Sequence, residues 1–150
     1  MKNIYALLFI MLSFSFFGQE EIPEISWDDL VIKDFEEATS ETGGTFKKAV
    51  LTKEQKALDG TKIIMAGNYH VLDNFGSKTY LLSREEIIMH PMQRDEVIRL
   101  KMDKDPEIYF GRKLKISGVL HIDTDPEAET IYYITDVKKV KNTGKIEGED

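Results

Sequence analysis

The chain has 150 residues, no cysteine and a formal net charge of −7 at pH 7, from 20 Lys and Arg against 27 Asp and Glu. The lack of cysteine excludes disulfides, thiolate metal sites and cysteine nucleophiles. The acidic balance disfavours nucleic acid and anionic lipid surfaces as partners, unless basic residues gather on one face. The length is sufficient for one domain with one hydrophobic core.

Residues 1–18, MKNIYALLFIMLSFSFFG, place one lysine before a short apolar run. This pattern predicts a secretory signal peptide, with cleavage after Gly18 or after Ser15 as the two alternatives. An uncleaved anchor is the third alternative. We therefore expect a periplasmic or secreted protein, without stable membrane insertion once the signal is removed.

Residues 19–44 are predicted to form an acidic N-terminal extension that ends in a linker. Nine acidic residues and one lysine lie between Glu20 and Glu41, and TSETGGT at residues 39–45 contains paired glycines typical of a linker. Within the extension, Ser26 is expected to cap a short helix. Trp27, the single tryptophan, is expected to cover one end of the core, with an exposed ligand platform as the alternative.

Residues 45–141 contain the signals of five strands. Thr52 and Gln55 predict a capped helical turn that ends at Gly60, and apolar alternation with a period of two follows over residues 60–72. A hairpin loop at 73–78 leads to a short second strand at 79–83, and a third strand is expected at 96–102. Residues 83–90 and 105–111 each predict a helical turn, and the last two strands are expected at 111–121 and 131–140.

Two of these strands resemble each other, GTKIIMAGNYH at residues 60–70 and GRKLKISGVLH at residues 111–121. A glycine inside a strand permits a bend or a bulge, so Gly67 and Gly118 predict two similarly bent walls of one barrel. The pattern favours a mainly β fold, a small five-stranded OB-like Greek-key barrel with short helical turns, over residues 45–141. Residues 142–150 are predicted to be a flexible tail.

The candidate metal ligands are the three histidines, His70, His90 and His121. We expect His70 and His121 on the outward faces of two strands that run antiparallel. That arrangement separates the two rings and argues against a shared ion. His90 lies on a loop near Asp95 and Glu96, whose carboxylates are further candidate ligands.

OB barrels often bind their ligands through aromatic and basic side chains on strands two and three. Here that surface offers Tyr80, Arg99 and Lys101, which join Trp27 as the candidate ligand-binding or partner-binding residues. The sequence contains no phosphate-binding glycine loop, dinucleotide fingerprint, metalloprotease helix, nucleophile elbow or calcium loop. We therefore expect no catalytic residues, no enzyme activity and no cofactor.

The sequence thus predicts a noncatalytic binding or interaction module. Export points to an envelope protein or a small ligand as its partner, and the acidic balance argues against nucleic acid. The alternative is a periplasmic metal-handling protein that uses surface histidines and carboxylates.

Four stretches carry a family resemblance: ISWDDLVIKDFEE, LTKEQKALDGTKIIMAGNYHVLD, TYLLS and the closing GRKLKISGVLHIDTD with IYYITDVKKV. Together they resemble uncharacterised secreted proteins of Bacteroidetes-type bacteria similar to the DUF3299 group. The resemblance implies an extracytoplasmic accessory protein that works beside an envelope transporter. Relatives often carry cysteines between the YLL strand and the third strand, where this sequence has residues 86–94 and no cysteine.

Overall fold

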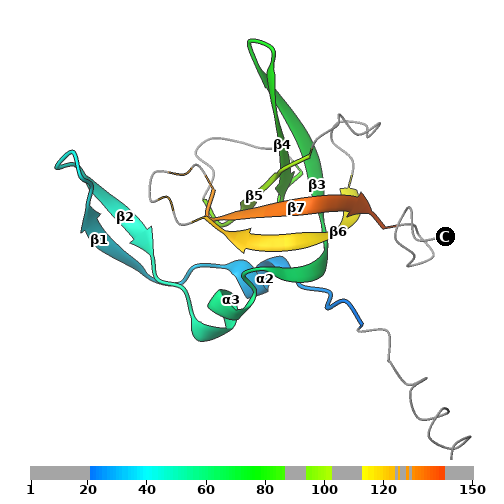
Figure 1. The fold of residues 1–150 in the computed structure, drawn as a ribbon, viewed down its shortest axis with the longest axis horizontal. Coiled ribbons are helices and arrows are strands. Elements are labelled where there is room, and N and C mark those ends of the chain that lie inside the picture. Colours follow the sequence, from blue (N-terminus) through cyan, green and yellow to red (C-terminus); the bar gives the residue numbers. More distant parts are fainter. Residues whose placement is uncertain are drawn as a thin grey trace, which may run out of the picture.

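The computed structural model describes residues 21–86, 94–102, 113–123, 125, 128 and 130–140. Five strands form a closed barrel in the order β3-β4-β5-β7-β6 (Figure 1). The strands are β3 (Thr61–Asn74), β4 (Ser77–Ser83), β5 (Val97–Leu100), β6 (Lys113–Ile122) and β7 (Tyr132–Lys139). All neighbours pair antiparallel except β5 and β7, which are parallel. The structure confirms the predicted five-stranded, OB-like barrel.

Strand β3 closes the barrel because it is long enough to pair with two neighbours. Residues from Thr61 to Asn68 pair with β6, and residues from Asn68 to Asn74 pair with β4. The alternation in the sequence fixes the inward face, since Ile63, Met65 and Tyr69 are all buried. The prediction that the two similar strands run antiparallel is correct, and they are also direct neighbours in the barrel.

The two mid-strand glycines lie where neighbouring strands approach closely. A Cβ on Gly67 would lie 2.6 Å from Cγ of Leu82, and a Cβ on Gly118 would lie 2.6 Å from the carbonyl oxygen of Thr135. The pairing of β6 with β7 also shifts between Ser117 and Val119, so Gly118 lies at an irregularity of the ladder, as the sequence predicted.

The acidic extension packs on the barrel. Its helix α2 (Trp27–Leu30) begins at Ser26, whose backbone N–H and hydroxyl both donate to the Asp29 carboxylate, at 2.7 and 2.8 Å. Leu30 is fully buried in the barrel core, and its carbonyl accepts a hydrogen bond from the Tyr132 hydroxyl at 3.2 Å. The extension therefore supplies part of the core.

Helix α3 (Lys53–Ala57) is connected to the extension by a hydrogen bond. Thr52 caps it by accepting from the Gln55 N–H at 3.1 Å, as predicted. The buried Gln55 side chain donates to the Val31 carbonyl at 2.9 Å, which ties the two helices together. Gly60 follows with a φ of +74°, the left-handed conformation expected at the end of this turn.

The predicted linker is instead part of a second sheet. Strands β1 (Phe35–Thr39) and β2 (Thr45–Ala49) form a two-stranded hairpin that lies to one side of the barrel (Figure 1). Residues 40–44 form its turn, where Gly43 has a φ of +85°. The glycines therefore serve a chain reversal rather than a flexible connection.

Several predicted features lie outside the described residues: the signal at 1–18, the turn at 105–111, the tail at 142–150 and His90. The predicted helical turn after Ser83 lies partly outside them, and Ser83 itself is the last residue of β4. Across the described ranges, no helix has the length and apolar character needed to span a membrane.

Candidate ligand-binding groove

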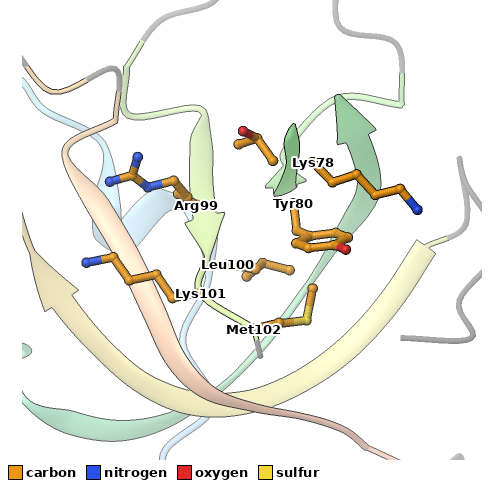
Figure 2. Close-up of a pocket in the computed structure, with 7 residues that line it drawn as sticks. Lys78, Tyr80, Arg99, Leu100, Lys101 and Met102 are labelled. Carbon is orange, nitrogen blue, oxygen red and sulfur yellow. The ribbon is translucent and has the colours of Figure 1, made fainter. Parts of the chain in front are cut away.

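A groove of about 360 Å³ opens on the barrel wall where β4 and the chain leaving β5 separate. The pairing of these strands begins at Tyr80 and Leu100, so the residues before Tyr80 and after Leu100 diverge. The groove is lined by Lys78, Thr79, Tyr80, Arg99, Leu100, Lys101 and Met102. Figure 2 shows Tyr80, Leu100 and Met102 gathered together, with Arg99 and Lys101 extending to the other side of β5.

Tyr80 forms an aromatic wall of the groove. Its ring stacks on the ring of Tyr69, with centroids 6.4 Å apart and planes 13° from parallel. Tyr69 is fully buried in the core, so it provides a rigid support for the half-buried Tyr80. A ligand in the groove therefore meets an aromatic face that the core holds in place.

Arg99 and Lys101 are both held by neighbours on the outer face of the barrel. The Arg99 guanidinium lies 3.8 Å from the Asp123 carboxylate, and the Lys101 ammonium lies 3.5 Å from the centroid of the Tyr133 ring. His121 stacks on the same ring at a centroid distance of 4.9 Å. These contacts position both cations at the rim of the groove without burying their charge in a core.

The lining of the groove is cationic. Lys78, Arg99 and Lys101 contribute three positive charges, and the lining includes no carboxylate. Within the described part of the chain, Nε of Arg99 is buried without a hydrogen-bond partner. The groove thus combines anion-binding groups with the apolar surfaces of Leu100 and Met102, and this suits a ligand that carries both a negative charge and an apolar body.

The structure therefore brings together Tyr80, Arg99 and Lys101, three of the four predicted binding residues. Trp27 lies elsewhere, on α2, where its indole N–H donates to the Ala66 carbonyl of β3 at 2.8 Å. Its ring is half-buried and packs against the core. Trp27 thus covers the barrel, in agreement with the first of the two roles considered for it.

His70 differs from its predicted position on the solvated outer surface. It belongs to the outward set of residues on β3, yet it is only 3% exposed, and Nε2 lies 2.8 Å from the Ser83 hydroxyl. Alternation predicts on which side of the sheet His70 lies but not what covers that side, so its burial could not be predicted from the sequence. Desolvation lowers the pKa of His70 below its usual value.

His121 is far from His70. Leu120, the residue before it, pairs with Thr61 at the start of β3, and the strand from Thr61 to His70 has a length of roughly 30 Å at about 3.3 Å per residue. Nε2 of His121 lies 3.0 Å from the Thr135 hydroxyl. The two rings cannot share an ion, and no group of three or more His, Asp or Glu suited to a metal occurs among the described residues.

The sequence analysis did not name four of the lining residues as site residues: Lys78, Thr79, Leu100 and Met102. It also did not name Tyr133, whose ring contacts Lys101. Met102 continues the alternation of the third strand, which would have placed it beside Leu100. Lys78 and Tyr133 depend on the strand register, because Tyr133 pairs with Arg99 only through the parallel contact of β5 with β7. Local patterns carry no signal for such a long-range pairing.

Comparison with known proteins does not assign a family to this barrel. The resemblance to the DUF3299 group stays a prediction from the sequence. No match to the chain was found among protein-family models, curated proteins or solved structures.

Proposed function

We propose that the protein is a noncatalytic, exported binding module that holds an anionic group of its partner in the β4–β5 groove. The observation that supports this most directly is the groove lining, which includes three cations and a tyrosine and no carboxylate. The groove also lies on the second and third strands of the barrel, the surface that OB-type barrels commonly use for ligands.

The existing contacts of the two rim cations are weak enough to exchange. The ion pair of Arg99 with Asp123 is only partly exposed, but its N–O distance of 3.8 Å is too long for a hydrogen bond, so an incoming carboxylate or phosphate can replace it. Arg99 can then bind that group through two parallel hydrogen bonds, which lysine cannot do. Lys101 and Lys78 add charge without fixed geometry.

The predicted signal peptide favours a partner in the cell envelope. We infer an acidic or terminal segment of an envelope protein, such as a transporter component, as the first candidate, and a small anionic ligand as the second. Both present the same chemistry to the groove, a negative charge beside an apolar group.

The protein partner can be identified by photo-crosslinking in intact cells. A photoreactive amino acid at Lys101 should form one discrete adduct, whereas the same amino acid at Lys47, an exposed lysine of the β1–β2 hairpin, should not. Adding Arg99→Glu should abolish the Lys101 adduct. An adduct that forms equally at Lys47, or that survives Arg99→Glu, would argue against the groove.

A small ligand can be detected by its effect on thermal unfolding. An anion bound at 100 times its dissociation constant stabilises the folded chain by about 2.7 kcal/mol, and the rise in melting temperature should be lost in Arg99→Glu. If the Lys101 position yields no specific adduct and no anion stabilises the wild type more than Arg99→Glu, the proposed function is wrong.

A further inference from the structure

The tip of the β3–β4 hairpin presents a fully exposed aromatic side chain. Phe75 and Gly76 form the two-residue turn between Asn74 and Ser77, and this tip projects beyond the barrel (Figure 1). Phe75 has a relative exposure of 110%, so its ring makes no packing contribution to this fold. Leu72, on the same hairpin, is 42% exposed.

The backbone at Phe75 is also unfavourable for its side chain. Phe75 has a φ of +53° and Gly76 a φ of +91°, which is the turn that asparagine, aspartate or glycine normally occupies at its first position. A bulky residue there is strained, and strain of this kind is most often found at contact sites. Both its exposure and its backbone indicate that Phe75 contacts something outside its own fold.

A receptor for such a ring lies on the same chain. The groove runs beside Lys78 and Thr79, along the edge of β4 that has not yet met β5, and ends at Tyr80, where the pairing with Leu100 begins. It offers the Tyr80 ring, the Met102 thioether and Leu100, which are suitable neighbours for a phenylalanine. Because the turn between Phe75 and β4 is tight and Phe75 is fully exposed, the ring does not reach its own groove.

We propose that two copies of the chain associate through this hairpin, each inserting Phe75 into the groove of the other. A two-fold axis at Ser77 sets the β4 edges antiparallel, with Ser77 opposite Ser77 of the second copy and Phe75 opposite Thr79, which lines the groove beside Tyr80. The contact is then reciprocal, as closed two-fold symmetry requires. This register also sets Gly76 rather than Lys78 opposite the second copy's Lys78, which avoids directly opposed like charges.

The proposal does not depend on the unknown ligand, because the association can be measured with the protein alone. Sedimentation equilibrium of the protein purified after expression of the full 150-residue chain should show reversible dimers between about 1 µM and about 1 mM. Phe75→Ala should raise the dimer dissociation constant at least about tenfold, the effect of truncating a buried aromatic anchor. Phe35→Ala, the same change at the exposed aromatic of the β1–β2 hairpin, should leave it unchanged.

A second variant separates loss of association from loss of folding. Phe75→Asn suits the turn, so the folded chain should be at least as stable as the wild type while the dimer is lost. The chain has no native cysteine, so Ser77→Cys, which lies on the proposed axis, should oxidise to a covalent dimer. Thr45→Cys, which follows the turn of the other hairpin, should not.

Three results would overturn the proposal. One is a wild-type chain that stays monomeric over the whole concentration range, and this would assign the Phe75 tip to a membrane or to a different protein. Another is a dimer that persists in both Phe75 variants. The third is equal oxidation of Ser77→Cys and Thr45→Cys, which would show that the chains meet only by random collision.

Discussion

Gly67 lies where two strands leave no room for a side chain. A Cβ at this position would meet Cγ of Leu82 at 2.6 Å and the carbonyl oxygen of Ser83 at 2.9 Å, and a backbone atom cannot move aside as a flexible side chain can. We expect Gly67→Ala to destabilise the protein by about 1–3 kcal/mol, the usual cost of overpacking. Urea unfolding measures this.

A matched glycine provides the control for that experiment. At Gly44 the nearest neighbour of a new Cβ is the Ser40 hydroxyl at 3.4 Å, an ordinary contact. Gly44→Ala should therefore change the free energy of unfolding by less than about 0.5 kcal/mol. Equal effects of the two substitutions would show that the close approach at Gly67 does not limit stability.

His70 should make the stability of the fold depend on pH. Burial lowers its pKa in the folded chain below the ordinary value of 6.5, so the unfolded chain binds the proton more readily. This contribution to stability is complete above pH 6.5 and is lost as the pH falls toward the lowered pKa of the folded state. The slope contributed by one such group is at most about 1.4 kcal/mol per pH unit.

The measurement compares two proteins, because carboxylates also titrate in acid. The free energy of unfolding of the wild type and of His70→Gln is determined at several pH values between neutrality and mild acid. The difference between the two should be constant above pH 6.5 and should shift in favour of His70→Gln below it. A difference that is the same at every pH would contradict the role assigned to burial.

At the scale of elements, the extension and the barrel should unfold together. Leu30 comes from α2 but is fully buried in the barrel core. Leu30→Ala should cost about 2–5 kcal/mol, as for other buried leucines, whereas Leu72→Ala at a 42% exposed site should cost less than about 0.5 kcal/mol. Urea unfolding should show a single transition in each protein, and a separate transition for the extension would contradict this packing.

The elements also show what the sequence could and could not reveal. The walls β3 and β6 were predictable because each buries one face, which leaves a period of two in the sequence. The β1–β2 hairpin buries neither face fully, so its strands carry no such period and were not predicted. Its signal lay instead in charge, since Glu36 and Glu37 pair with Lys48 and Lys47.

The residues of the groove were predictable in part, but its shape was not. Tyr80 and Arg99 could be assigned to the second and third strands, which OB barrels often use for ligands, once an OB-like order was assumed. The shape of the groove follows from where the pairing of β4 with β5 begins, and only the folded register sets that point. Neither composition nor alternation carries that information.

For the whole molecule, the stabilising features and the proposed binding features lie at different ends. The helices α2 and α3 lie at one end of the barrel, and the β3–β4 hairpin projects from the other (Figure 1). A change at the hairpin tip should therefore alter binding while leaving the core intact. This separation allows the groove and the Phe75 contact to be tested in a folded protein.

If Phe75 of a second copy fills the groove, the dimer and the partner compete for one site. Only the monomer is then competent to bind, and the apparent dissociation constant equals the intrinsic constant divided by the monomer fraction. Phe75→Ala should therefore increase the yield of the partner adduct from Lys101, and lower that of any adduct between two copies, at protein concentrations where the wild type is dimeric. On dilution below the dimer dissociation constant, the two proteins should give the same yield.

The direction of the change distinguishes competition from direct contact. If Phe75→Ala lowers the Lys101 adduct at every concentration, Phe75 itself contacts the partner and belongs to the binding surface. If the yield rises only where the wild type is dimeric, the hairpin tip blocks the groove of the second copy. The concentration dependence distinguishes the two cases, because a contact within one partner complex does not depend on how many free copies of the chain are present.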